Sequence, residues 1–212
     1  MLLIDILPRG VAKMAIQVGR RYPKRFELRD GSVVTVRPMS RADESALVDF
    51  FARIPPEERY FLKEDVTSPL VIREWIDNLD YDKALPLLAL DGRRVVADAA
   101  LLRHRSAAFG HSAEVRVVID PAWRSRGLAV GLMNELAELA AENDIEELVF
   151  EFVRGVQDSG IEAAEFLGAS VEAVLPGWVR GSDGTRYDVV FLRLPLGSDA
   201  GPGDAPGGRE PA

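Results

Sequence analysis

The chain has 212 residues and a mass of 23.3 kDa, and 47% of its residues are hydrophobic. This is enough for one globular domain with its own core, and it excludes a largely disordered chain. The absence of cysteine and the presence of only two histidines exclude disulfide scaffolds, thiol nucleophiles and iron–sulfur clusters. They also leave little material for a histidine metal site or a Ser–His–Asp triad.

The net charge of −8 is unevenly distributed. Residues 1–41 carry nine Lys and Arg against three Asp and Glu, so the remainder of the chain has a net charge of −14. Phosphate backbones require a basic surface, and we therefore expect no nucleic-acid partner. The negative charge of this larger part of the chain suits a cationic amine acceptor. A surface that serves only solubility would have the same net charge.

Neither a membrane span nor a signal peptide is predicted. The sequence has no run of eighteen apolar residues, and its opening segment MLLIDILPRG is short, contains Asp5 and precedes no small-residue cleavage site. We therefore expect a cytoplasmic protein.

Composition divides the chain into a basic extension at 1–26, one domain at 27–196 and a tail at 197–212. The tail has almost no large apolar residues, and we expect it to be disordered. In the extension, apolar residues at spacings of three and four predict one helical stripe, made of Ile4, Leu7, Val11, Met14 and Val18. The stripe would pack on its own domain, on a second copy in a homodimer or on a membrane surface.

The domain alternates strands and helices, which predicts a mixed α/β fold. A strand at 33–37 leads to a helix that begins after Ser40 and turns Leu47, Phe50 and Phe51 inward. The elements expected after it are helices at 55–62 and 68–79, a hairpin that turns at Asp91-Gly92, a strand at 113–120, a helix at 127–143, a strand at 145–153, a helix at 159–168 and strands at 170–179 and 186–194.

The turn between residues 120 and 128 carries the strongest chemical signal. It joins a strand directly to a helix, contains Arg124 and Arg126, and has small residues at Gly127 and Ala129. Backbone amides at such a helix start favour a phosphate or pyrophosphate, although the same turn can be purely structural. The segment lacks the P-loop and Rossmann patterns and so implies neither ATP nor NAD.

The sequence from Arg124 to Ala129 (RSRGLA) resembles the [Q/R]-x-x-G-x-[G/A] motif of the GNAT acyltransferase superfamily, and the likeness extends over about residues 27–196. It implies a mixed, mostly antiparallel sheet of about seven strands flanked by helices, with a V-shaped splay between the fourth and fifth strands. It also implies acetyl-CoA as co-substrate, with no metal. The implied acetyl-CoA contacts are Val117, Val118, Ile119, Arg124, Ser125, Arg126, Gly127, Leu128, Ala129 and Val130, with Val118 or Ile119 donating to the thioester carbonyl.

A narrower resemblance is to bacterial protein lysine acetyltransferases of the Pat type, in which a glutamate stands ten residues before the motif. Glu114 occupies that position relative to Arg124. The likeness implies that Glu114 is the general base and that the acceptor is a primary amine, either a protein lysine or a small amine. The alternative for Glu114 is a strand-edge residue without a chemical role.

The sequence also departs from the family pattern. Ala164 stands where many members carry a tyrosine acid, Gly168-Ala169 replaces their Gly-Phe pair, and Gln157 is the nearest substitute for their asparagine. Loss of a general acid slows a reaction by about 10² to 10⁴-fold and does not forbid it. The alternative function is a catalytically weak acyl-CoA-binding sensor or interaction module.

Two further residues have alternative interpretations. Tyr187 is a second candidate proton donor, with strand packing as its alternative. Asp98 lies in an apolar strand and could steer an amine, or it could be a hydrogen-bonded buried carboxylate.

Overall fold

The computed structural model describes residues 21–104 and 106–197. The predicted stripe from Ile4 to Val18 and nearly all of the predicted tail lie outside these residues. Within the described ranges, no helix is both long and apolar enough to cross a membrane.

The described residues form one sheet of eight strands in the order β1-β2-β3-β4-β5-β6-β8-β7. Only β5 and β6 are parallel, and all other neighbours are antiparallel. The mixed, mostly antiparallel sheet is therefore confirmed. The strands are β1 (Lys24–Glu27), β2 (Val33–Pro38), β3 (Ala84–Asp91), β4 (Arg94–Arg103), β5 (Ser112–Ile119), β6 (Glu147–Val153), β7 (Ser170–Arg180) and β8 (Arg186–Pro195).

The strand that the sequence did not reveal is β1, which crosses the predicted boundary between residues 26 and 27. It pairs with β2 from Lys24 opposite Val36 to Glu27 opposite Val33. Three of its four residues are charged and only Phe26 is apolar, so it has none of the hydrophobic alternation that predicts a strand. Charged side chains are common on edge strands, where they discourage further pairing.

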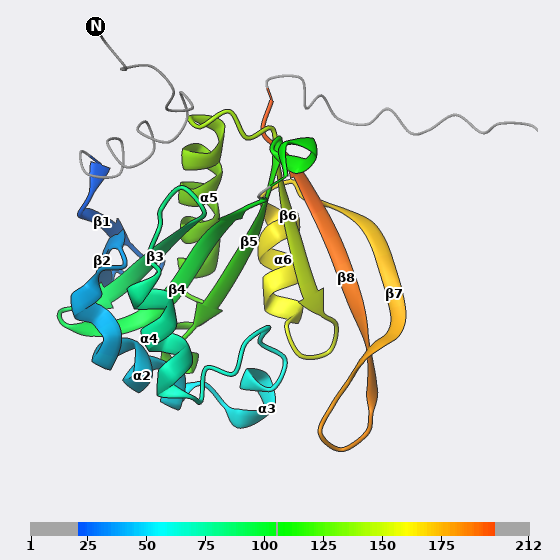
Figure 1. The fold of residues 1–212 in the computed structure, drawn as a ribbon, viewed down its shortest axis with the longest axis horizontal. Helices are drawn as coiled ribbons and strands as arrows, with labels where there is room; N and C mark the ends of the chain where they lie inside the picture. Colours follow the sequence, from blue (N-terminus) through cyan, green and yellow to red (C-terminus); the bar gives the residue numbers. More distant parts are fainter. Residues whose placement is uncertain (1–20, 105, 198–212) are drawn as a thin grey trace, which may run out of the picture.

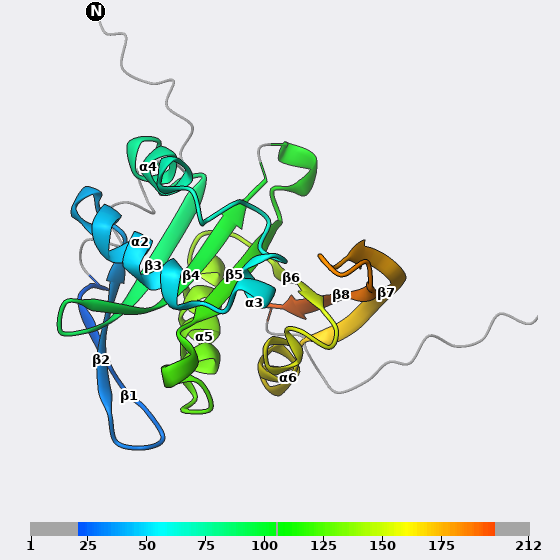
Figure 2. The same cartoon turned by 90° about the horizontal axis from the view of Figure 1, so that it is seen from below.

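Helices cover both faces of the sheet (Figures 1 and 2). The helices α2 and α4 pack on one face with β3 and β4, and α5 and α6 pack on the other. The helices are α2 (Glu44–Arg53), α3 (Pro56–Arg59), α4 (Pro69–Asp77), α5 (Leu128–Ala141) and α6 (Asp158–Phe166), and short 3-10 turns occur at Arg41–Asp43, Ala107–Phe109 and Pro121–Trp123.

The start of α2 shows how local signals fix an element. Asp43 accepts a hydrogen bond from the Ser40 amide at 2.8 Å and pairs with Arg37 at 2.6 Å. Ser40 and Asp43 thus form a capping box around a single 3-10 turn, and α2 begins directly after this turn, four residues after Ser40. Leu47, Phe50 and Phe51 are buried as the periodicity predicts.

The feature that shapes the site is the divergence of β5 from β6. The two strands pair only where Ser112–Glu114 meet Glu147–Val149. Beyond these residues they separate toward α3, as Figure 1 shows. This is the splay expected between the fourth and fifth predicted strands, and it leaves the end of β5 without a neighbour on one side.

Candidate functional site

Two cavities meet in the splay. The first, which we call the motif cavity, has a volume of about 430 Å³ and lies between the Arg124–Ala129 turn, the start of α5 and the residues of α6. The second, the acidic cavity, has a volume of about 590 Å³ and lies between α4, the segment 61–66 and β3 to β6. Both cavities are lined by Leu62, Val117, Val118, Phe152 and Gln157.

The motif turn is held in a conformation that favours glycine. Gly127 has a φ of +84° and is the N-cap of the 14-residue helix α5. Glycine has no side chain to cap the helix, so the first amides of α5 are left for a ligand. A Cβ added at Gly127 would lie 3.2 Å from Nε of Arg29, which shows how closely packed this turn is.

Nine of the ten residues predicted to contact acetyl-CoA line the motif cavity, and Arg126 does not. The Arg126 guanidinium donates to the Ala122 carbonyl at 2.8 Å, pairs with Asp30 at 2.8 Å and lies 4.8 Å from the centre of the Trp123 ring. Its positive charge is therefore neutralised outside the cavity, and only its backbone belongs to the turn.

Arg124 lines the cavity, but its guanidinium is already occupied. It donates two hydrogen bonds to the Glu58 carboxylate, at 2.9 and 2.6 Å, and two more to the Ile119 carbonyl, at 3.3 and 3.2 Å. Such a bidentate pair fixes the orientation of both groups. Arg124 thus fastens α3 to the end of β5 and holds the wall of the cleft.

The backbone alternation of β5 decides which amides face the splay. The Asp120 amide donates to the Val96 carbonyl of β4 at 2.9 Å, and the register between these strands is regular up to Ile119. In an antiparallel pair every second residue directs its N–H and C=O away from its partner. The amides of Val117 and Ile119 therefore face the splay, and that of Val118 is directed at β4.

Arg29 also belongs to this site, although no pattern in the sequence indicated it. Arg29 follows β1, its amide donates to the Arg126 carbonyl at 3.0 Å, and its guanidinium lies 5.9 Å from the centre of the Phe166 ring. It therefore lines the motif cavity between the β1–β2 turn and α6. This position depends on a hairpin that the sequence did not predict.

The structure shows where the residues that depart from the family pattern lie relative to the two cavities. Ala164 is fully buried in the core and does not line either cavity, whereas Gln157 lines both and accepts a hydrogen bond from the Val153 amide at 2.8 Å. The Tyr187 ring lies 5.2 Å from the Phe61 ring and lines neither cavity. Among the residues that the structure describes, no phenol lines the cleft.

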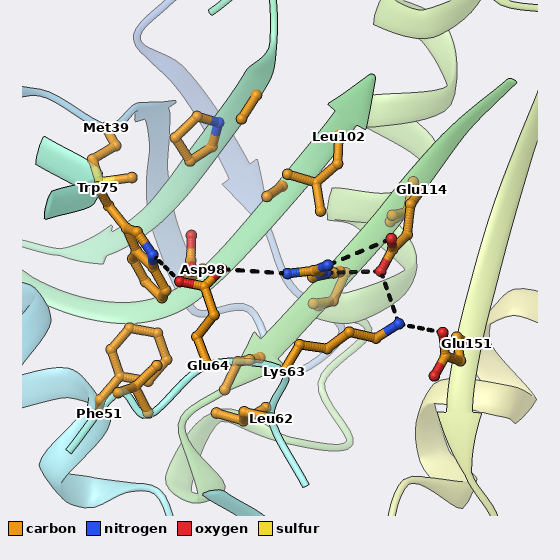
Figure 3. A pocket seen from close by; sticks show the side chains of 18 of the residues that line it. Met39, Phe51, Leu62, Lys63, Glu64, Trp75, Asp98, Leu102, Glu114 and Glu151 are labelled. Atoms are coloured by element: carbon orange, nitrogen blue, oxygen red, sulfur yellow. Dashed lines mark hydrogen bonds and ion pairs between the residues drawn. The ribbon is translucent and has the colours of Figure 1, made fainter. Parts of the chain in front are cut away.

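Glu114 lies in the acidic cavity within a network of ion pairs (Figure 3). Arg116 Nε is 2.7 Å from its carboxylate and Lys63 Nζ is 3.6 Å away, and Lys63 also pairs with Glu151 across the splay. Burial opposes ionisation of Glu114, but the hydrogen bond and charge of Arg116, aided by Lys63, lower the pKa of the carboxyl below its usual value. Glu114 is thus an anion at neutral pH.

Asp98 lines the same cavity in a different environment. Its Oδ1 atom is shielded from solvent and accepts no hydrogen bond from the described residues. Burial raises the pKa of this carboxyl to about 7. The sequence allowed Asp98 to be either a hydrogen-bonded buried carboxylate or a residue that steers an amine. Its Oδ1 atom does not fit the first interpretation, because it has no hydrogen-bond partner among the described residues.

Asp120 anchors the strand end from which the motif turn departs. Its buried carboxylate accepts from Arg53 Nε at 2.7 Å, Arg94 Nη2 at 2.9 Å and the Ala122 amide at 3.1 Å. Burial opposes its ionisation, but the hydrogen bonds from Arg53 and Arg94 outweigh burial and lower the pKa. The carboxylate therefore stabilises the fold above the pKa of the unfolded chain, about 3.9.

We expect Asp120→Ala to lower the free energy of unfolding by about 2 to 3 kcal/mol, since it leaves two arginines without a buried partner. Glu44→Ala is the matched control, because its pair with Arg73 is exposed and such pairs contribute less than about 1 kcal/mol. Urea unfolding measures both. The difference between wild type and Asp120→Ala should shrink as the pH falls below about 4; equal losses in the two variants would contradict this role.

The comparisons with known proteins agree with this architecture. The model of the acetyltransferase (GNAT) family matches residues 46–168, more than half of the chain. A comparison with curated protein sequences finds no match.

Solved structures with the same fold include three whose descriptions name an acetyltransferase or its domain. The GNAT domain of S. lividans PAT has a TM-score of 0.67 and 23% identity over 81% of this chain and 96% of that one. A putative acetyltransferase from Salmonella typhimurium with acetyl-CoA has a TM-score of 0.66 and 20% identity over 81% and 99%. A phosphinothricin acetyltransferase from Sinorhizobium meliloti in complex with acetyl-CoA has a TM-score of 0.66 and 19% identity over 77% and 89%.

The family match covers the motif turn, the splayed strands and the helices on both faces, which are the parts that build the cleft. The chain belongs to the acetyltransferase (GNAT) family.

Proposed function

We propose that the protein is an N-acetyltransferase that transfers the acetyl group of acetyl-CoA to a primary amine by direct attack. The observation that carries this proposal is the meeting of the two cavities at Val117 and Val118. One cavity has the amides of a helix start and the other has carboxylates, so a phosphate-bearing donor and a cationic acceptor would enter from different sides.

The motif cavity fits the donor. The uncapped amides at the start of α5 suit a pyrophosphate, and Gly127 leaves the approach open where any side chain would intrude. Arg29, which lines this cavity, forms no ion pair among the described residues and adds positive charge. Two of the structures with this fold are described as containing acetyl-CoA, which supports the same ligand here.

When bound, acetyl-CoA supplies the acetyl group as an activated thioester. The chain supplies hydrogen-bond donors for the developing oxyanion, which we assign to the amides of Ile119 and Val117 because they face the splay. Of the two donors that the resemblance implied, this orientation favours Ile119 over Val118.

Glu114 would act as general base, directly or through a water molecule. The ammonium group of an alkyl amine such as lysine has a pKa of about 10.4 and must lose a proton before the nitrogen attacks. Arg116 and Lys63 keep Glu114 ionised and therefore able to accept that proton. The same two cations make it a weak base, which favours transfer through water to bulk solvent.

One observation favours the alternative of a catalytically weak acyl-CoA-binding sensor. The cleft is lined by no phenol among the described residues, and Ala164 is buried in the core. A CoA thiolate, with a pKa of roughly 8.5 by analogy with cysteine, is nevertheless a tolerable leaving group without an acid.

Release of free thiol from acetyl-CoA in the presence of amines distinguishes the two functions. We expect amine-dependent thiol release with a panel of small primary amines and lysine peptides, and one acetylated product per thiol by mass spectrometry. Binding of acetyl-CoA without turnover for any amine would establish the sensor in place of the enzyme.

A further inference from the structure

Asp98 lines the acidic cavity and has no positively charged partner among the described residues, and its Oδ1 atom is shielded from solvent. Three cations line this cavity, and each is paired with another carboxylate: Lys63 with Glu114 and Glu151, Arg116 with Glu114 and Glu64, and Lys83 with Asp80. Within the part of the chain that the structure describes, Asp98 has no such partner. A carboxylate oxygen that is shielded from solvent and has no partner opposes folding, so another molecule is the expected source of the counter-ion.

The position of Asp98 places that counter-ion beside the reaction centre. Asp98 lies opposite Val118 in the pairing of β4 with β5, and Val118 lines both cavities. Side chains of directly opposed residues are about 5 Å apart on the same face of a sheet. A cation on Asp98 is therefore next to the junction at which donor and acceptor meet.

The other residues that line the cavity indicate which kind of acceptor would fit beside Asp98. Met39, Phe51, Trp75 and Pro86 line it, and the Trp75 Nε1–H is already satisfied by Glu64 at 2.6 Å. A volume of about 590 Å³ is in the range of small-molecule sites. All three lining cations are paired, so the described residues of the cavity offer no free positive charge to a carboxylate on the acceptor.

We propose that Asp98 binds the ammonium group of the acceptor, and that the acceptor is a small primary amine with an apolar or aromatic body and no carboxylate. This proposal rests on the proposed function, which it narrows to a substrate class. The raised pKa of Asp98 agrees with it, because an empty site stays partly protonated and a bound cation draws the proton off.

Calorimetric titration without acetyl-CoA tests the site separately from catalysis. The probes are 2-phenylethylamine, its neutral analogue 2-phenylethanol, phenylalanine and a short lysine peptide. Wild type should bind the amine at least about 10-fold more tightly than the alcohol, a difference of ~1.4 kcal/mol. Asp98→Asn should abolish this difference, while Asp91→Asn, which changes an exposed aspartate on the β3–β4 turn, should preserve it.

Thermal unfolding of the ligand-free protein gives a second readout. Asp98→Asn should fold and unfold at a higher temperature than wild type, since it removes the charge from a carboxyl whose Oδ1 atom is shielded and unpaired. Unchanged amine affinity in folded Asp98→Asn would overturn the role of Asp98. Tighter binding of phenylalanine or the lysine peptide than of 2-phenylethylamine would overturn the substrate class. Absence of thiol release with every amine would overturn the proposed function, and the binding results would still decide the role of Asp98.

Discussion

Replacement of Gly127 by valine is expected to abolish acetyl-CoA binding, which means a loss of more than ~100-fold or about 2.7 kcal/mol. Gly127 is the N-cap of α5 and has a φ of +84°. A Cβ atom added to it would lie 3.2 Å from Nε of Arg29. A branched side chain there would cover the first amides of the helix and displace Arg29 from the wall of the motif cavity. Both changes remove groups that we assign to phosphate binding.

The variant also introduces backbone strain, because a left-handed conformation costs an L-residue about 1 to 2 kcal/mol. Gly184→Val is a closely matched control, since Gly184 has a φ of +86°, lies in the β7–β8 turn and has no atom within 4 Å of its added Cβ. We expect similar destabilisation of both variants in urea unfolding and loss of acetyl-CoA binding in Gly127→Val alone. Wild-type affinity in folded Gly127→Val would remove the motif cavity as the donor site.

Replacement of Glu114 by glutamine is expected to lower kcat/KM by about 10²-fold or more near neutral pH. Glutamine keeps the shape of the side chain and still accepts a hydrogen bond from Arg116, but it cannot take a proton from the amine. Because the pKa of Glu114 is lowered, wild type holds it ionised from about pH 6.5 to about pH 9. The loss should shrink as the pH approaches the pKa of the amine, where free amine needs no base.

The measurement is kcat/KM against pH for both proteins, expressed as their ratio so that shared titrations cancel. Glu172→Gln is the control, because Glu172 is a strand glutamate paired with an arginine, Arg193, at 3.0 Å and lies outside the cleft. Acetyl-CoA affinity should stay at the wild-type value in both variants. A constant ratio at all pH values would mean that Glu114 only maintains the network with Lys63 and Arg116, and a ratio of one would remove it from the reaction.

The sequence alone determined those features of the protein that depend on residues close together in the chain. The motif turn could be identified because strand, Gly127 and helix follow one another within a few positions, and left-handed backbone with open amides is a local property. The buried face of α5, with Leu128, Leu132, Leu136 and Leu139, follows from helical spacing in the same way. The family resemblance rested on such segments, and the family match confirms it.

The tertiary structure decided how the chemical groups are partnered. The guanidinium of Arg124 binds Glu58, which is 66 positions away in the chain, and Lys63 pairs with both Glu114 of β5 and Glu151 of β6. Sequence spacing has no information on such contacts, because they form only when distant segments pack. For the same reason the sequence could present Asp98 as an acidic residue in an apolar strand, and only packing of β3, β5 and α4 around it shows that its Oδ1 has no partner among the described residues.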